Sequence, residues 1–214
     1  IPADALSAVE RALVEPLTVG FHAVDRGRVD DTDTVLVLGC GMVGLGAVAR
    51  AAARGAFVIG VDVDEGKLAT ARRVGAHQTL DAGQPDLHEQ IQACTDGRGP
   101  DVTIEAAGRP ATYRLAVDES AFAGRVVCIG YAKEEVAFAT KLFVQKELGI
   151  VGARNATPQD FAAVIRYLRD GGFPVADVVS RCVPLAGAGQ ALAAWAEDPG
   201  VITRILVEVS GSAE

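Results

Sequence analysis

Between Val35 and Gly55 the chain reads VLVLGCGMVGLGAVARAAARG, an apolar run that passes through a glycine-rich loop into an alanine-rich stretch. The run at 34–39 is rich in Val and Leu, which predicts a strand buried on both faces of a sheet. The stretch at 42–55 predicts a helix that ends at Gly55. Because a buried strand followed by a helix is the unit from which parallel sheets are built, this segment restricts the chain to an α/β fold.

The same alternation continues along the chain and predicts a six-stranded parallel sheet. Strands are expected at 34–39, 57–62, 78–81, 101–108, 125–130 and 148–153, with helices at 42–55, 64–76, 86–95 and 110–123. Crossovers between parallel strands are right-handed, and helices then cover both faces of the sheet. We therefore expect a doubly wound α/β fold.

The two ends of the chain do not continue this alternation. They predict helical segments at 7–27, 157–172 and 186–198 and a last strand at 202–209. The first segment should be two helical stretches broken at Pro16, because proline removes a backbone donor and disrupts a helix interior. The second should begin at Thr157 as N-cap, with Asp160 three residues later. These flanks are typical of a neighbouring structural unit.

The composition argues against several classes of partner and compartment. The net charge is −8 and the pI about 4.9, whereas nucleic acids and anionic membranes bind basic faces. No apolar run approaches the roughly 18 residues of a transmembrane helix, and the first residues do not resemble a secretory signal. The cysteines are far apart and without metal-site spacing, which favours free thiols in a reducing, cytoplasmic compartment. They are Cys40, Cys94, Cys128 and Cys182.

Gly39, Gly41 and Gly44 form a GxGxxG pattern between the first strand and its helix. Glycines in this pattern permit a tight turn, a close approach of backbone to pyrophosphate, and close packing of helix on strand. The helix N-terminus offers free N–H groups to phosphates, so this loop, with Met42 and Val43, predicts dinucleotide binding. A glycine-rich turn that binds no ligand is the alternative.

Asp62 ends the second strand, 18 residues after Gly44, where an acid accepts hydrogen bonds from ribose hydroxyls. Together with Asp64 and Glu65 it would repel the 2′-phosphate of NADP, so the pattern favours NAD. Lys67 is the nearest cation and a further candidate for cofactor contact. Asp64 and Glu65 also have a structural interpretation, because acids in a first turn suit the helix dipole.

Two later strands end in small residues that are weaker candidates for cofactor contact. The fourth strand ends at Ala107-Gly108 and the fifth at Ile129-Gly130. Ligands of doubly wound folds lie outside the carboxyl ends of the strands. Backbone groups of the first pair would then meet the adenosine side, and those of the second the nicotinamide carboxamide. Glycine also ends strands for ordinary turn reasons.

Six stretches carry a more specific pattern: ALVEPLTVGFHAV, VLVLGCGMVGLGAV, VIGVDVDEGKLATARRVGA, TIEAAG, GRVVCIGY and KELGIVGARNATPQDFAAVI. In this series the chain resembles the medium-chain zinc-dependent alcohol dehydrogenases over about residues 1–209. The most similar branch is that of the polyol and sugar-acid dehydrogenases, the sorbitol dehydrogenase-like group.

The resemblance implies a Rossmann-type cofactor domain at 17–154, flanked by parts of a second domain. Residues 1–16 would be a connector from an N-terminal GroES-like catalytic domain that the chain lacks, and 155–214 would return to it. The chain begins Ile1-Pro2 without an initiator Met, which agrees with an excised or processed segment.

Glu15 and Arg154 are the catalytic candidates that the resemblance implies. Glu15, in VEPL, matches a Glu of the polyol branch that completes the zinc site, and a carboxylate is a legitimate zinc ligand. Arg154, in VGARNA, would lie at the cleft between domains and orient Glu15, a metal-bound water or the substrate. Alternatively, Glu15 is an acid before Pro16 at a helix N-terminus, and Arg154 is an exposed arginine after a strand.

The mechanism that the resemblance implies is hydride transfer from a secondary alcohol, a polyol or a sugar acid to NAD, with zinc binding the substrate hydroxyl. The other zinc ligands would come from the missing domain, so this chain alone would be inactive. One alternative is a standalone NAD-binding module, and another is a zinc-free reductase similar to quinone reductases.

The strand at 148–153 should be a sheet edge. The resemblance implies that the chain forms a homodimer or homotetramer through this edge, as family members do.

Overall fold

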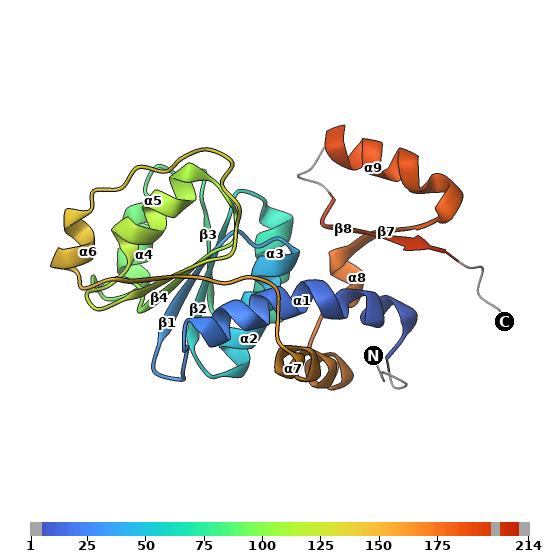
Figure 1. Cartoon of the computed structure of the whole chain (residues 1–214), viewed down its shortest axis with the longest axis horizontal. Coiled ribbons are helices and arrows are strands. Elements are labelled where there is room, and N and C mark those ends of the chain that lie inside the picture. The colour runs from blue at the N-terminus through green and yellow to red at the C-terminus, as the bar shows by residue number, and fades with distance from the viewer. Residues whose placement is uncertain (1–5, 198–201, 210–214) are drawn as a thin grey trace.

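A computed structural model describes residues 6–197 and 202–209 and confirms the doubly wound sheet (Figure 1). Six parallel strands have the order β3-β2-β1-β4-β5-β6. They are β1 (Thr34–Leu38), β2 (Phe57–Asp62), β3 (Gln78–Asp81), β4 (Val102–Glu105), β5 (Arg125–Cys128) and β6 (Gly149–Gly152). The order reverses between β1 and β4, and ligands of open α/β sheets bind at such a switch point.

Helices cover both faces of the sheet, as the alternation of side chains along each strand requires. The crossover helices are α2 (Met42–Ala53), α3 (Glu65–Val74), α4 (Leu87–Cys94) and α5 (Pro110–Glu119). On β1, Val35 and Val37 belong to the core under α2 and α3, whereas Leu36 and Leu38 belong to the core under α4 and α5. All four of these side chains are fully buried.

Helix α1 (Ala8–Arg26) corrects the prediction of two helical stretches broken at Pro16. The helix is continuous, and Pro16 is one of its buried residues. A proline inside a helix costs about 3 kcal/mol, but each fully buried large apolar side chain contributes roughly 1.5–3 kcal/mol. Leu13, Leu17 and Phe21 are all 0–1% exposed on this helix, so tertiary packing outweighs the local cost.

A small second unit follows the sheet. It contains α7 (Pro158–Arg169), α8 (Val175–Val178), β7 (Val179–Pro184), a 3₁₀ turn (Leu185–Gly187), α9 (Ala188–Glu197) and β8 (Arg204–Glu208). Strands β7 and β8 pair in parallel as a separate two-stranded sheet, which with α9 stands apart from the main sheet in Figure 1. The short helix α6 (Lys141–Gln145), α8 and β7 were absent from the sequence prediction.

The start of α7 confirms the predicted cap. The Thr157 backbone N–H and Oγ1 donate to Asp160 Oδ2 at 2.6 and 2.7 Å. His22 Nδ1 of α1 lies 3.1 Å from the same oxygen. Asp160 is 3% exposed. Its buried carboxylate therefore caps the N-terminus of α7 and links this helix to α1.

Within the described ranges, no helix is both long and apolar enough to cross a membrane. All four cysteines are free thiols, and only Cys40 among them is fully buried.

Candidate functional site

The predicted glycine loop lies at the carboxyl end of β1, at the switch point of the sheet. Gly39 has φ +95°, a conformation that side chains rarely adopt. Gly41 is the N-cap of α2 and makes no side-chain capping bond. A Cβ built on Gly41 would meet no protein atom within 4 Å. The first N–H groups of α2 therefore open onto free space beside an uncapped helix N-terminus, which favours an anion.

Arg204 of β8 was not predicted as a site residue, but the fold brings it to this loop. Arg204, Lys67 and the loop residues Gly41–Gly44 line a cavity of about 380 Å³, together with Trp195 of α9. The Arg204 Nε atom is buried and has no hydrogen-bond partner among the described residues. Arg204 and the N-terminus of α2 line the same cavity, and a guanidinium and a helix N-terminus both favour an anionic ligand. An arginine inside the largely apolar run ITRILVEV was the available sequence signal.

Asp62 lies at the end of β2 and is tied to the glycine loop. Its Oδ2 accepts from the Cys40 N–H at 2.7 Å, and its Oδ1 accepts from the Asp64 N–H at 3.1 Å. A carboxylate has about four lone-pair sites, so Asp62 retains capacity for ribose hydroxyls. Asp64 is the N-cap of α3 and accepts from the Lys67 N–H at 2.9 Å, so of the two acids expected in the first turn only Glu65 lies there.

A second cavity, of about 330 Å³, continues from Asp62 across the strand ends. Gly39, Gly41, Lys67 and Ala107, four of the predicted cofactor contacts, line it, and so do Arg109 and Thr112, which the sequence did not single out. Strands β4 and β5 end at Glu105 and Cys128, earlier than predicted, so Ala107-Gly108 and Ile129-Gly130 lie in the loops that follow them. Ile129 and Gly130 line a further cavity of about 430 Å³.

Two of the cysteine thiols lie near the strand ends, and both have raised pKa values. Burial, followed by the charge of Asp62, raises the pKa of the Cys40 thiol to about 12. Burial, followed by the charge of Glu105, raises the pKa of the Cys128 thiol to about 11. Both thiols are protonated at neutral pH and are poor nucleophiles.

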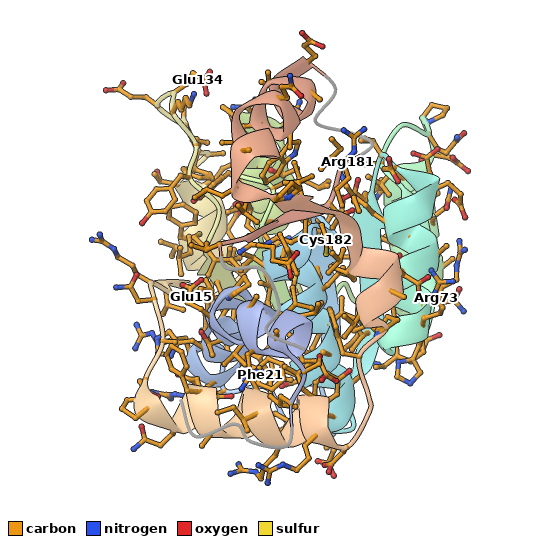
Figure 2. The ribbon with its side chains drawn as sticks, turned by 90° about the vertical axis from the view of Figure 1, so that its right-hand side faces the viewer. Glu15, Phe21, Arg73, Glu134, Arg181 and Cys182 are labelled. Atoms are coloured by element: carbon orange, nitrogen blue, oxygen red, sulfur yellow. The ribbon has the colours of Figure 1, made fainter. Side chains whose placement is uncertain are left out.

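The structure does not bring Glu15 and Arg154 together in a site. Both side chains are exposed, Glu15 on α1 (Figure 2) and Arg154 just after β6. Neither residue lines the cavities at the strand ends. Among residues 6–197 and 202–209, no group of three or more His, Cys, Asp or Glu side chains could hold a metal ion.

The sequence of the chain matches a known family model and several related proteins. The family model described as zinc-binding dehydrogenase matches residues 42–170. The chain is 33% identical over 186 residues to the L-galactonate-5-dehydrogenase of Escherichia coli K12, covering 87% of this chain and 55% of that protein. It is 34% identical over 151 residues to the sorbitol dehydrogenase of Bacillus subtilis 168, covering 70% and 43%.

The fold matches solved structures as well. A zinc-binding dehydrogenase structure from Sinorhizobium meliloti 1021 with NADP bound has a TM-score of 0.86 to this chain. The two are 27% identical, and the match covers 95% of this chain and 60% of that one. The chain spans about half the length of the curated relatives that it matches.

Proposed function

Since the chain belongs to the zinc-binding dehydrogenase family, we propose that it forms the NAD-binding part of an oxidoreductase. The reaction is hydride transfer from a secondary alcohol, a polyol or a sugar acid, to NAD with zinc assistance. One observation carries the proposal: the N-terminus of α2, which no side chain caps, opens onto a cavity that Arg204 and Lys67 also line. The pyrophosphate of a dinucleotide is an anion that a helix N-terminus and an arginine both bind.

The remaining parts of NAD occupy the neighbouring cavities at the carboxyl ends of the strands. Asp62 accepts hydrogen bonds from the adenosine ribose, and Lys67, Ala107 and Arg109 surround the adenosine half. The first N–H groups of α2, at 42–43, face the pyrophosphate. The nicotinamide half then extends toward 129–130. NAD supplies the hydride acceptor, whereas this chain binds and orients it.

Asp62 also supports NAD over NADP. A 2′-phosphate on the adenosine ribose would lie next to the Asp62 carboxylate, which already accepts two backbone hydrogen bonds. The two negative charges would repel each other. The Sinorhizobium structure holds NADP, so this preference is a proposal about the residues of this chain and not a property of every relative.

The described residues do not form a zinc site, and we derive no catalytic step through the metal. We propose that Glu15 contributes one ligand only beside ligands from elsewhere in a longer polypeptide, and that Arg154 assists at that site. In this arrangement 1–16 is a connector, 17–154 the cofactor domain and 155–214 a return segment of the catalytic domain. The exposed edge strand β6 is the surface proposed for a homodimer or homotetramer.

Fluorescence titration with NADH tests the proposal directly. The chain should enhance NADH fluorescence saturably and should bind NADPH roughly tenfold or more weakly. Adenosine diphosphate ribose should displace NADH, because it carries the adenosine, pyrophosphate and ribose groups. A chain that is folded by circular dichroism but leaves NADH fluorescence unchanged contradicts the proposal.

A further inference from the structure

We propose that Glu105 is a positioning residue that sets the separation of the two strand-end loops between which the cofactor lies. These are Ala106–Arg109 after β4 and Ile129–Tyr131 after β5, called here the β4 loop and the β5 loop. The inference rests on the proposed binding of NAD, and it assigns a role to a buried carboxylate that contacts no cofactor itself.

The side chain of Glu105 organises the β4 loop. Glu105 is 0% exposed, and its Oε1 accepts from the Ala107 N–H at 3.0 Å and the Gly108 N–H at 2.8 Å. The hydroxyl of Thr112, on the first turn of α5, donates to the same oxygen at 2.7 Å. One oxygen atom therefore receives three donors from the loop and the helix that follows it.

The backbone of Glu105 organises the β5 loop at the same time. Its carbonyl oxygen accepts from the Ile129 N–H at 2.9 Å and the Gly130 N–H at 3.0 Å. Tyr113 of α5 makes a third hydrogen bond to the β5 loop, because its hydroxyl donates to the Gly130 carbonyl. The two loops are thus joined through one residue and the helix beside it.

Gly130 shows how closely the two loops approach. A Cβ built on Gly130 would lie 2.3 Å from the Gly108 nitrogen and 2.6 Å from Glu105 Oε2. Such contacts leave no room for a larger residue, so the spacing between the loops is set by backbone on one side and the carboxylate on the other.

The hydrogen bonds to Glu105 determine which backbone groups of the two loops remain available to a ligand. The N–H groups of Ala107, Gly108, Ile129 and Gly130 all donate to Glu105. At these four positions the carbonyl oxygens are therefore the backbone polar groups left for a ligand. The predicted backbone contacts at these positions are therefore acceptor contacts, which fit the amide NH₂ of nicotinamide.

Only one carboxylate oxygen is used in these bonds. Glu105 Oε2 is buried and has no hydrogen-bond partner among the described residues. A glutamine can place its amide oxygen where Oε1 lies and accept the same three bonds. A positioning role therefore predicts that Glu105→Gln preserves cofactor binding, whereas Glu105→Ala removes the acceptor that holds the Ala107 and Gly108 N–H groups in place.

The test measures NADH binding by fluorescence in the full chain. We expect Glu105→Ala to raise the Kd for NADH roughly tenfold or more, and Glu105→Gln to change it less than about threefold. The matched control is Thr103→Val on the same strand. It removes the buried Thr103–Ser120 hydroxyl pair of 2.8 Å without touching either loop, so it should lower Tm but leave the Kd unchanged.

Several outcomes overturn the inference. If Glu105→Ala binds NADH as tightly as the wild type, or Thr103→Val weakens binding equally, Glu105 has no specific positioning role. A Glu105→Gln variant as weak as Glu105→Ala has the same meaning. If Glu105→Ala does not fold, Glu105→Asp replaces it, because the shorter side chain keeps the charge but withdraws the acceptor and should weaken binding at least about threefold.

A wild-type chain that binds no NADH would refute the proposed function, and amide hydrogen exchange then decides the role of Glu105 separately. Exchange at Ala107 and Gly108 should be roughly tenfold faster in Glu105→Ala than in Thr103→Val. Equal exchange in these variants overturns the positioning role whatever the ligand.

Discussion

A Cβ built on Gly44 would lie 1.8 Å from the carbonyl oxygen of Gly39. The first turn of α2 thus packs directly on the end of β1, and no side chain fits between them. Gly41, only three residues away, is the opposite case, because nothing lies within 4 Å of its Cβ position. The two glycines therefore have different roles. Gly44 allows α2 to pack closely on β1, whereas Gly41 leaves space for a ligand.

The first prediction concerns Gly44→Ala. The added methyl collides with backbone that flexible side chains cannot relieve, so we expect a loss of stability of roughly 2 kcal/mol or more. Urea unfolding followed by circular dichroism measures it. An unchanged midpoint would show that β1 and α2 do not pack in direct contact at this position.

The second prediction is that Gly41→Ala separates binding from stability. Gly41 has φ −69° and ψ −175°, which alanine adopts without strain, so Tm should change by less than about 3 °C. The methyl occupies the space assigned to the pyrophosphate, and the Kd for NADH should rise roughly tenfold. Full NADH affinity in this variant would place the phosphates elsewhere.

The centre of the sheet was predictable because β1, β2 and β4 are buried on both faces and are rich in apolar residues. β2 and β3 have the predicted bounds of 57–62 and 78–81. In contrast, β7 reads VSRCVP and has mostly exposed residues, and no apolar run marks such a strand. The continuity of α1 through Pro16 depends on packing that local propensity does not contain.

The sequence could predict only those site residues that lie close together along the chain. The glycine loop and Asp62 lie within one β–α–β unit with a known spacing. Arg204 reaches the same cavity from β8, far along the chain, through the folding of the second unit against the loop. The role of Glu105 depends on which N–H groups meet in space, which no local pattern in TIEAAG encodes.

The third prediction concerns Arg204→Gln. Removing the guanidinium beside the N-terminus of α2 should raise the Kd for NADH roughly tenfold, because a charge-assisted contact to the pyrophosphate is lost. The matched control is Arg181→Gln, which removes the same charge from an exposed position on the neighbouring strand β7 (Figure 2). Equal effects of the two changes would indicate a general charge effect rather than a phosphate contact.

The fourth prediction is that Asp62→Asn reduces the preference for NADH over NADPH roughly tenfold. Asparagine keeps one acceptor for the Cys40 or Asp64 N–H but removes the negative charge. Titrations with both cofactors measure the ratio of the two Kd values, and Asp118→Asn, at an exposed position of α5 that lines neither cavity, is the control for charge alone. An unchanged ratio for Asp62→Asn would remove Asp62 from the determinants of cofactor choice.

The fifth prediction concerns the pH dependence of stability through Asp160. Burial alone would raise the pKa of this carboxyl, but the hydrogen bonds from Thr157 and the contact with His22 outweigh burial and hold the pKa below its ordinary value. A lowered pKa in the folded state means that the carboxylate stabilises the fold above about pH 4, its unfolded pKa, and that this contribution is lost as pH falls through the lower folded value.

Asp160→Asn should therefore lower the free energy of unfolding by about 1 kcal/mol at pH 7, and the difference from the wild type should shrink as pH falls below about 4. Asp170→Asn, at the exposed C-cap of the same helix, makes the same change of charge without a capping bond and should have little effect. Urea unfolding from about pH 7 to about pH 3 measures all three proteins. A difference between wild type and Asp160→Asn that stays constant over this range would show that the capping bonds do not depend on ionised Asp160.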